Sequence, residues 1–355
     1  MLVNGSAESA MGIRARGLFE SSALNGWAVI LYREQRGLAA LFYFLRQVFY
    51  LRPGMIYVLN IGYAGVGCAL FYRVFFRVPY MLDTGDLLYE MAALTRQGTC
   101  IYRQFLRLGE FVALKLAHKI VVRGSAHITL LKEQGCRNVR LVPDGVWPQH
   151  SRPMDTSDLR AGLGLEDKFV IGVMGSCHWI PALDWAYGLD LVEVLARLKK
   201  YPVCGIMIGD GDGLEVVKNR AIQAGVAERV LFLGRVAYDQ LPLWINLFDF
   251  ALSTQNNTLA ARVRTTGKLP EYLACGRYVI ASAVGEARNH LPPDMLVEYI
   301  GSRDYTYAGR VAGRIARVLA RQPRPPLHYA AGVAIARRNF DYELLGRRLK
   351  KIIME

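Results

Sequence analysis

The sequence predicts an α/β protein with two domains, each built around a parallel sheet. Strand-like runs alternate with helix-like runs from end to end, as parallel α/β layers require. The chain has 355 residues, which is long for one ordinary core. A polar, proline-bearing stretch at 146–168 interrupts the alternation and indicates a linker. We expect domains over 1–148 and 149–328, followed by a C-terminal helix over 329–355.

The first half starts with a short strand, MLVNG (1–5), a loop of small residues and a helix from about Ile13 to Leu24. Runs rich in β-branched and aromatic residues predict the next strands. These strands cover 27–34, 55–60, 79–83, 119–124 and 139–145. Helical stretches are expected at 36–51, 101–117 and 125–134.

The second half repeats the pattern. Strands are expected at 169–175, 203–211, 229–234, 248–253, 277–282 and 295–300. PRPP (323–326) precedes a final basic helix at 329–353. Two Rossmann-like halves with a central cleft would place ligands at the carboxyl ends of these strands.

The first candidate motif is the glycine-rich stretch within 208–236, IGDGDGLEVV. Gly209, Gly211 and Gly213 stand where a strand gives way to a helix. Glycines there permit a tight turn and a close approach of the backbone to an anion. The alternative is a strand-to-helix turn without a ligand.

The second candidate motif is GKLPEYLACGRYVIAS (267–282) with the basic loop before it. Arg264 and Lys268 could neutralise a diphosphate, and Glu271 could accept hydrogen bonds from a ribose diol. The alternative is a set of surface charges, with Glu271 as a favourable acid in the first helical turn.

Together, the two motifs resemble the nucleotide-sugar half of the glycogen-synthase-like (family 4, group 1) retaining glycosyltransferases. The match runs from about Phe169 to Ser282 and includes GVAERVLFLGRV (225–236) and EYLACGRYVIAS (271–282). In the first half, YMLDTGDLLYE (80–90), LAHKIVVRGSAHITLLKEQG (116–135) and LVPDGV (141–146) are also similar to segments of this family.

The resemblance implies the GT-B fold, with two Rossmann-like domains facing a cleft and a C-terminal helix that crosses back to the first domain. It also implies a set of donor-binding residues. These are Gly5, Gly12, Gly175, His178, Gly209, Gly211, Gly213, Arg264, Lys268 and Glu271. Val263 stands where the family often has a second Glu that touches the sugar, and the 174–185 loop has His178 but no Lys or Arg.

Three residues are candidates for catalysis. Lys268 would stabilise the charge of the leaving diphosphate. Asp83 or Asp86, at the end of a predicted strand, could orient the acceptor hydroxyl or accept its proton, because a dry cleft raises the pKa of a carboxylate. The alternatives are a turn-stabilising role for Asp83 and a helix N-cap for Asp86. The resemblance implies retention of configuration, with no metal and no cofactor beyond the nucleotide-sugar co-substrate.

The positive charge points to an anionic partner. The formal net charge is +14 at pH 7. Residues 31–52 mix aromatic and aliphatic side chains with spaced arginines, as an interfacial helix does. The alternative is a buried helix with arginines reaching solvent at its ends. No nucleic-acid-binding pattern accompanies the charge, so we expect no nucleic-acid partner.

Several features bear on location. The apolar region 38–76 is interrupted by arginines, and no apolar run reaches the roughly 20 residues that span a bilayer. The N-terminus lacks a signal-peptide pattern. The six cysteines are widely spaced and are expected to be reduced core residues. These are Cys68, Cys100, Cys136, Cys177, Cys204 and Cys275. We predict a cytoplasmic protein, peripheral on the inner face of the membrane.

The predicted function is transfer of a sugar from a nucleotide-diphosphate donor to a glycan or lipid-linked acceptor. Two alternatives stay open at this stage. One is a soluble glycosyltransferase that acts on a small metabolite. The other is a catalytically weak scaffold or binding subunit, which the departures at Val263 and in the 174–185 loop would suit.

Overall fold

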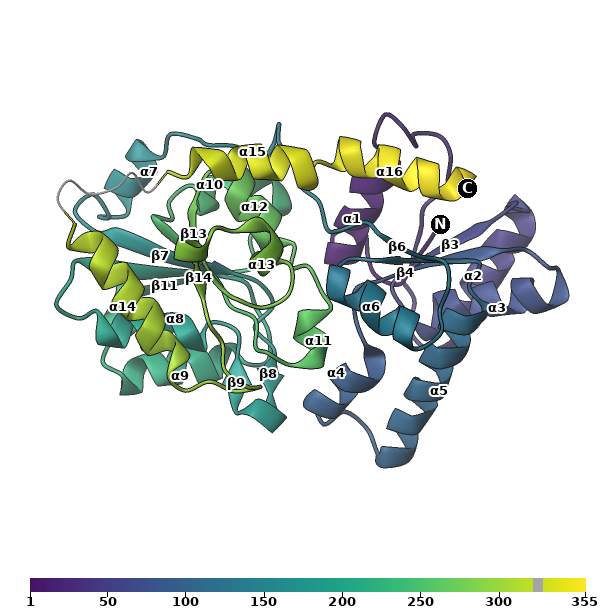
Figure 1. The fold of residues 1–355 in the computed structure, drawn as a ribbon, viewed down its shortest axis with the longest axis horizontal. Helices are drawn as coiled ribbons and strands as arrows, with labels where there is room; N and C mark the ends of the chain where they lie inside the picture. Colours follow the sequence, from purple (N-terminus) through teal and green to yellow (C-terminus); the bar gives the residue numbers. More distant parts are fainter. Residues whose placement is uncertain (322–327) are drawn as a thin grey trace.

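The computed structural model describes residues 1–321 and 328–355, and it contains two parallel sheets of six strands each. Figure 1 shows two α/β bodies side by side, with the C-terminal helices running along both. The predicted fold class, two Rossmann-like domains, is confirmed. The loop PRPP (323–326) lies outside the described residues.

The first sheet has the strand order β2-β1-β3-β4-β5-β6. Its strands are β1 (Leu2–Val3), β2 (Leu31–Tyr32), β3 (Ile56–Leu59), β4 (Tyr80–Thr84), β5 (Lys119–Val122) and β6 (Val139–Leu141). The order reverses at β1 and β3, which leaves a crevice beyond their carboxyl ends. The loop that follows β1 therefore lies where a ligand is expected to bind.

Helices cover both faces of this sheet, so most strand residues are buried whichever way they point. The helices of this half are α1 (Ala10–Phe19), α2 (Leu38–Leu51), α3 (Tyr63–Phe75), α4 (Leu88–Leu94), α5 (Cys100–Leu116) and α6 (Ser125–Glu133). One core joins the sheet to α2, α3, α5 and α6. A second core joins its other face to α1 and to the C-terminal helix.

The second sheet has the order β11-β10-β7-β12-β13-β14. Its strands are β7 (Phe169–Met174), β10 (Val203–Ile208), β11 (Val230–Gly234), β12 (Phe250–Ser253), β13 (Tyr278–Ser282) and β14 (Leu296–Val297). This is the Rossmann order, and its switch point lies between β7 and β12. A short antiparallel hairpin, β8 (Trp179–Ile180) and β9 (Trp185–Ala186), follows β7 and was not predicted.

Eight helices accompany the second sheet in the described chain before the final crossing. They are α7 (Ser157–Gly162), α8 (Leu189–Arg197), α9 (Leu214–Gln223), α10 (Leu241–Ile245), α11 (Leu259–Arg262), α12 (Lys268–Ala274), α13 (Ala287–His290) and α14 (Tyr307–Leu319). Helix α7 lies within the stretch predicted as a linker. Leu159, Leu163 and Leu165 around it pack into a hydrophobic core of the second half. The stretch predicted as a linker is therefore in part a structured element of that half.

The C-terminal segment forms two helices, α15 (Ala330–Asn339) and α16 (Tyr342–Met354), where one helix was predicted. The break has a clear cause, because the carboxylate of Asp341 accepts the N–H of Glu343 and caps α16. Helix α15 packs on α12 of the second half, and α16 packs on α1 of the first (Figure 1). The predicted crossing is therefore confirmed, but it occurs at the break and not within one helix.

Two hydrogen bonds tie this break to the other connection between the halves. The N–H of Val146 donates to the carbonyl of Phe340 at 2.8 Å, and the N–H of Tyr342 donates to the carbonyl of Val146 at 3.1 Å. Gly145 lies against the ring of Tyr342, where a β-carbon would come within 2.7 Å. We call these two paired connections, 145–147 and 340–342, the double crossing.

Two expectations about the surface are also resolved. Five cysteines are buried, but Cys100 is exposed at the start of α5, so the prediction that it is a core residue is wrong. It begins an amphipathic helix whose first turns face away from the sheet. Within residues 1–321 and 328–355, no helix is long and apolar enough to cross a bilayer.

Candidate functional site

The strand ends of the two sheets face each other, and polar contacts hold the two halves together there. Arg264, from the loop between α11 and α12, forms an ion pair with Asp86. The backbone N–H and the hydroxyl of Ser125 donate to the carboxylate of Glu286, at 2.6 and 2.5 Å. The hydroxyl of Thr265 also donates to the carbonyl of Arg123. The predicted donor loop of the second half thus meets the acidic strand end of the first.

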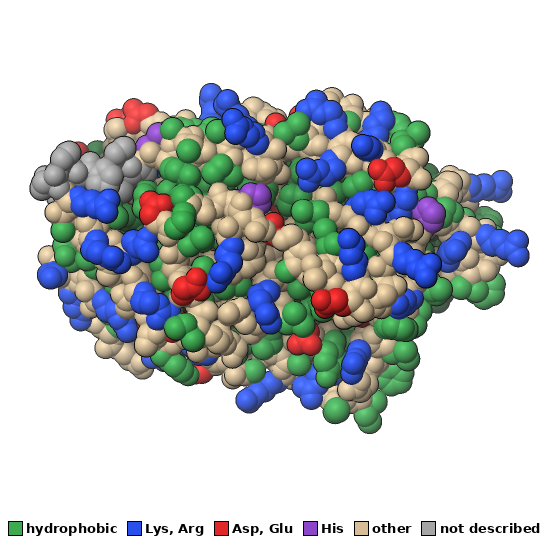
Figure 2. Space-filling view, viewed as in Figure 1, with side chains coloured by type: hydrophobic (Ala, Val, Ile, Leu, Met, Phe, Trp, Pro, Cys, Tyr) green, Lys and Arg blue, Asp and Glu red, His purple; other side chains and the backbone are tan. Residues whose placement is uncertain are grey.

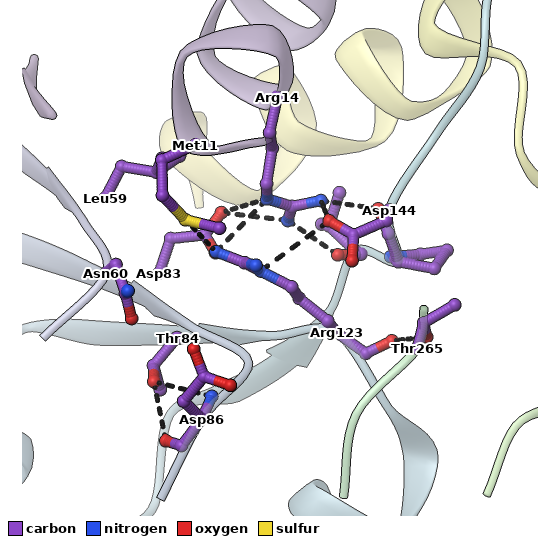
Figure 3. Close-up of polar contacts among 12 residues, drawn as sticks. Met11, Arg14, Leu59, Asn60, Asp83, Thr84, Asp86, Arg123, Asp144 and Thr265 are labelled. Carbon is purple, nitrogen blue, oxygen red and sulfur yellow. Dashed lines mark hydrogen bonds and ion pairs between the residues drawn. The ribbon is translucent and has the colours of Figure 1, made fainter. Parts of the chain in front are cut away.

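Asp83 lies at the centre of a buried charge cluster (Figure 3). Arg14 of α1 approaches its carboxylate at 2.8 Å, and Arg123 approaches it at 3.4 Å. The hydroxyl of Tyr57 donates to it at 2.7 Å. Asp144 pairs with the same two arginines at 3.3 and 3.7 Å. Two guanidinium groups therefore face two carboxylates in the interior of the first half.

This environment argues against a proton-accepting role for Asp83. Its side chain has no exposed surface, and three neighbouring side chains already donate to it. Arg14 also donates to the carbonyls of Val142 and Pro143, which fixes the chain where it leaves β6. The structure favours the structural alternative for Asp83, as the anchor of α1 and of the exit from β6.

Asp86 is placed differently. It lies apart from the buried cluster (Figure 3), and its side chain keeps about a fifth of its surface exposed. Burial opposes its ionisation, but the guanidinium groups of Arg264 and Arg123 outweigh burial and lower the pKa of Asp86. The expectation of a raised pKa is wrong for this residue, because the second half supplies a cation. Asp86 is therefore an ionised carboxylate at the boundary between the halves.

His127, on the first turn of α6, is a site residue that the sequence analysis missed. It is completely buried, and neither ring nitrogen has a hydrogen-bond partner among the described residues. Burial lowers the pKa of His127 to about 4, and the charge of Asp86 only partly offsets this effect. A neutral imidazole thus lies close enough to Asp86 to feel its charge.

Lys268 begins α12 and approaches the loop after β7. Its Nζ lies 3.4 Å from the centre of the Tyr187 ring, a cation–π contact. A β-carbon on Gly175 would lie 2.9 Å from this Nζ, so glycine at 175 (φ +152°) gives the ammonium its space. Burial lowers the pKa of Lys268 to about 7, and Arg264 adds to the effect. In the described part of the chain, no carboxylate is within ion-pair distance of it.

Glu271 lies one helical turn further along α12 and is almost fully buried. The hydroxyl of Ser151 donates to one carboxylate oxygen and the hydroxyl of Tyr238 to the other, both at 2.5 Å. Burial raises the pKa of Glu271, and these two hydrogen bonds act against the rise. Ser151 and Tyr238 were not predicted, because 120 and 33 residues separate them from Glu271.

The predicted glycines bring two loops of the second half together. A β-carbon on Gly209 (φ +131°) would lie 2.0 Å from the carbonyl oxygen of Gly175, and one on Gly211 would lie 2.3 Å from that of Cys177. Gly213 donates its N–H to the same Cys177 carbonyl at 2.9 Å. The glycine motif therefore packs against the loop after β7 and sets the position of Gly175 under Lys268.

His178 lies on the surface of that loop, with its side chain 70% exposed. Its Nδ1 is 3.3 Å from the carboxylate of Asp212, which also accepts the N–H of Trp179 at 3.0 Å. Asp210 accepts the N–H of Gly211 and lies 3.6 Å from Arg235. Across the described residues, no group of three His, Cys, Asp or Glu side chains is arranged to hold a metal ion.

Gly5 and Gly12 flank the loop between β1 and α1. A β-carbon on Gly12 would lie 2.2 Å from the carbonyl oxygen of Ala7, and one on Gly5 would lie 2.5 Å from the hydroxyl of Ser9. Ser9 caps α1 by accepting the N–H of Gly12 at 3.2 Å. Small residues therefore keep this loop folded tightly at the switch point of the first sheet.

Val263, which replaces the Glu that is common in the resembling family, is fully buried. Its carbonyl oxygen would lie 2.3 Å from a β-carbon on Gly124 of the first half. An apolar side chain is consistent with this tight contact between the halves. Position 263 therefore contributes to closure of the two halves in this chain.

Comparisons with known proteins agree with this architecture. Residues 168–300 match the sequence profile of the family described as Glycosyl transferases group 1. No curated protein sequence matches the chain significantly.

Among solved structures, HepE of Anabaena in complex with UDP-glucose has a TM-score of 0.74 at 18% identity, over 99% of this chain and 98% of that one. Sucrose-phosphate synthase of Thermosynechococcus elongatus has a TM-score of 0.70 at 18% identity, over 94% and 82%. The lipopolysaccharide outer core galactosyltransferase WaaB, in its apo form, has a TM-score of 0.65 at 12% identity, over 99% and 98%.

At these identities, the structural matches establish the shared fold, and the profile match shows that residues 168–300 are similar to the group 1 family. The profile covers the segment that carries Gly175, the glycine motif, Lys268 and Glu271. This chain therefore has the fold of these GT-B proteins, and its residues 168–300 match the family described as Glycosyl transferases group 1.

Proposed function

We propose that the chain transfers a sugar from a nucleotide-diphosphate donor, in the cleft between its two halves and with retention of configuration. The observation that carries this proposal is Lys268, a partly buried ammonium group without a carboxylate partner among the described residues. A buried cation without a counter-ion is energetically unfavourable, so binding of an anion at such a site is favourable. A diphosphate at the loop of Gly175 would satisfy it.

Arg264 supplies the second cation of this donor site. One of its nitrogens is occupied by Asp86, and a guanidinium has five N–H donors in all. The remaining donors can reach a phosphate while the ion pair persists. Two cations at the leaving group stabilise the negative charge that develops on the diphosphate, so the proposed reaction uses no metal ion.

Glu271 is proposed to bind the ribose. Ser151 and Tyr238 each use one lone pair of its carboxylate oxygens, and the other lone pairs are free to accept hydrogen bonds from a diol. Both existing donors are neutral hydroxyls, and no cation is within ion-pair distance of this carboxylate in the described chain. HepE was solved with UDP-glucose, which makes UDP-sugars the first donors to test.

Asp86 is proposed to hold the acceptor hydroxyl. The lowered pKa keeps its carboxylate ionised at neutral pH, as acceptance of a hydrogen bond from that hydroxyl requires. The acceptor oxygen would form a bond to the anomeric carbon while the bond from that carbon to the diphosphate oxygen breaks, and the hydroxyl proton would pass to the departing diphosphate. Asp86 and Arg264 are ion-paired across the cleft, so this contact places the acceptor next to the donor phosphates.

The acceptor is proposed to be a lipid-linked or polysaccharide glycan, reached from an anionic membrane surface. The outward sides of α2, α3 and α5 carry most of the exposed large apolar side chains of the described residues. Figure 2 shows hydrophobic side chains with Lys and Arg among them along the lower right of the molecule, where α5 lies in Figure 1. Such a mixture suits the boundary of a lipid headgroup layer.

The donor test is a thermal shift of pure protein with a panel of UDP-, GDP-, ADP- and TDP-sugars. A donor present at a hundred times its Kd stabilises the folded state by about 2.7 kcal/mol, which raises the melting temperature measurably. Lys268→Ala and Glu271→Gln should lose this shift. Lys218→Ala should keep it, because Lys218 is paired with Glu215 on the surface of α9. Failure of every donor to shift the wild type, or a full shift in Lys268→Ala, would overturn the proposal.

A further inference from the structure

An apolar pocket of about 450 Å³ lies between α3, α4 and α5 of the first half. This volume is within the roughly 300–1,000 Å³ of small-molecule sites. Its lining is aliphatic, aromatic or glycine apart from one acid, Glu110. The two carboxylate oxygens of Glu110 accept the N–H groups of Leu88 and Tyr89, at 3.0 and 3.3 Å. The acid is thereby occupied with capping α4 and leaves the pocket effectively apolar.

The pocket lining combines residues next to the cleft with residues of the outer surface. It includes Ile61 and Gly62, directly after β3, and Leu88, two residues beyond Asp86. It also includes Phe105 and Leu108, which are exposed on α5. A ligand in this pocket would therefore run from the proposed acceptor position to the apolar surface of the first half.

The lining favours a hydrocarbon chain over a peptide. Most of the pocket wall is formed by α3 and α5, whose backbone N–H and C=O groups are already bonded within each helix. A peptide backbone entering between them would have to give up its hydrogen bonds to water without replacement, which is unfavourable. A hydrocarbon chain has no such groups and gains from burial.

The cleft end of the pocket offers a cation for an anionic headgroup. The guanidinium of Arg33 lies 5.8 Å from the centre of the ring of Tyr63, which lines the pocket. The backbone N–H of Arg33 donates to the carbonyl of Gly5, so this residue borders the loop at the switch point. No acidic side chain within residues 1–321 and 328–355 is in ion-pair distance of Arg33. A phosphate fits this position by charge.

Helices α2, α3 and α5 add no exposed acid around the pocket, and the acid of α4 is the half-buried Glu90. Helices α2 and α3 contain no Asp or Glu, and α5 contains only the buried Glu110. Their charged residues are Arg46, Arg73, Arg103, Arg107 and Lys115. The three helices share one core against the same face of the sheet, so their outer sides form one surface. The outer sides of α2, α3 and α5 thus form an apolar surface whose charges are positive.

We propose that this pocket binds the hydrocarbon chain of a lipid-phosphate acceptor, with Arg33 at its phosphate. The inference rests on the proposed function and deepens it, because it assigns the acceptor to the lipid-linked class. The chain in the pocket would fix how far the phosphate, and the sugar attached to it, extends toward Asp86.

The test uses decyl phosphate below its micelle concentration, with decanol and inorganic phosphate as separate arms, and isothermal titration calorimetry as the readout. Gly109 lines the pocket within α5, and a β-carbon there meets nothing within 4 Å. Gly109→Leu therefore fills the pocket without strain and improves helix propensity. Gly313→Leu is the matched control, since Gly313 lies within α14 of the other half and is equally open.

The wild type and Gly313→Leu should bind decyl phosphate with a stoichiometry of one. Gly109→Leu should bind decyl phosphate at least tenfold more weakly. Arg33→Gln should lower the affinity for decyl phosphate more than the affinity for decanol. Inorganic phosphate should bind the wild type far more weakly than either amphiphile. Equal affinity of Gly109→Leu and wild type, or no binding of decyl phosphate by the wild type, would overturn the inference. UDP binding, measured on the same samples, is expected to be unchanged by Gly109→Leu. Its absence in the wild type would count against the proposed donor site and not against the pocket.

Discussion

The carboxylates of Asp83 and Asp86 are three residues apart in sequence but have different surroundings. Asp83 points into the first half, where two arginines and a tyrosine donate to it. Asp86 lies beyond the end of β4 and meets Arg264 of the second half. Because β4 ends between them, the Asp83 side chain lies in the interior of the first half and the Asp86 side chain lies at the cleft. The two residues should therefore respond differently to substitution.

Replacing Asp83 should affect stability more than replacing Asp86. Asp83→Asn leaves Arg14 and Arg123 without their shared buried anion, which should lower the free energy of unfolding by about 3–5 kcal/mol. Asp86→Asn removes a partly exposed pair and should cost about 1 kcal/mol or less. Urea unfolding of both variants measures the difference. A stable but inactive Asp83→Asn protein would contradict this assignment and restore a chemical role for Asp83.

Donor affinity should depend on pH through Lys268. Its pKa is lowered to about 7, so the free protein loses this charge as pH rises above 7. Diphosphate binding favours the ammonium form, so the complex must take up a proton at higher pH. The Kd for UDP should therefore weaken by up to tenfold per pH unit above 7, until the pKa of the complex is reached. Titration calorimetry at pH 6, 7, 8 and 9 measures this dependence.

Lys268→Arg provides the comparison for that experiment, because a guanidinium stays protonated across the whole range. Its pH profile should be flatter than that of the wild type, whatever its absolute affinity. A flat wild-type profile would show that Lys268 remains charged without a ligand. It would also remove the pH dependence from the proposed donor site.

Which site residues could be predicted depended on their distance in sequence from a motif. Lys268 and Glu271 stand in one short motif, and the structure places both on α12. Arg14 could not be identified, because its partner Asp83 is 69 residues away and no local pattern marks a buried arginine. Ser151 and Tyr238 were missed for the same reason. The pKa of Asp86 was misjudged because its cation comes from the other half.

At the scale of elements, strand and helix centres were predictable and their ends were not. The edge strand β2 covers Leu31–Tyr32, where 27–34 was expected, and Trp27 and Val29 are exposed before it. An edge strand has one neighbour, so apolar residues beyond the paired segment can leave the sheet. Helix α3 was not assigned, because Gly65 and Gly67 weaken its helical signal. One of these glycines has a packing reason, because a β-carbon on Gly65 would collide with the side chain of Asn4.

The contact between α6 and α13 should behave as a pH-sensitive clamp between the halves. Burial opposes ionisation of Glu286, but the imidazole of His290, 3.6 Å from the carboxylate, and the hydrogen bonds from Ser125 outweigh it and lower the pKa to about 2. A carboxylate with a depressed pKa adds stability above its unfolded pKa of about 4.3, and this stability is lost as pH falls toward 2. Glu286→Gln should therefore lower the free energy of unfolding by about 1–3 kcal/mol at pH 7.

The difference between wild type and Glu286→Gln should shrink between pH 4.5 and pH 3, as measured by urea unfolding. Glu298→Gln is the control, since that side chain is 64% exposed and pairs with Arg288 on the surface. The control should change stability by well under 1 kcal/mol at either pH. A difference for Glu286→Gln that stays constant with pH would show that the clamp acts by shape and not by charge.

At the scale of the whole molecule, the fold class followed from the alternation of strands and helices and from the linker. The order of the strands did not follow from the sequence. Crossover connections between parallel strands are right-handed, but this rule does not say at which edge of the sheet the next strand joins. The pairing of β1 with both β2 and β3 illustrates this, since each neighbour fits the same apolar pattern. The break at Phe340–Asp341 was also missed, although Asp341 belongs to a residue type that commonly caps helices.

The proposed membrane binding involves the outer helices of the first half, so it should depend on salt. Binding to vesicles with anionic phospholipid should fall as ionic strength rises from 0.01 to 0.1 M, because the screening length drops from about 30 to about 10 Å. Phe42→Asp and Phe105→Asp, on α2 and α5, should each reduce the bound fraction severalfold in a flotation assay. Ile222→Asp is the control, since it is as exposed but lies on α9 of the other half. Equal loss in all three variants would exclude a dedicated lipid face.

The double crossing has a mechanical consequence. Within the described residues, the polypeptide passes between the halves at 145–147 and at 340–342, and these two passages are hydrogen-bonded to each other. Two bodies joined at one such point cannot slide past each other without breaking those bonds, but they can swing about it. The cleft contacts of Arg264 and Glu286 are separate from those two hydrogen bonds, so a swing about the crossing would change them. A ligand that engages both sides of the cleft would therefore act on a single rotational coordinate, and the angle it selects would set whether donor and acceptor meet.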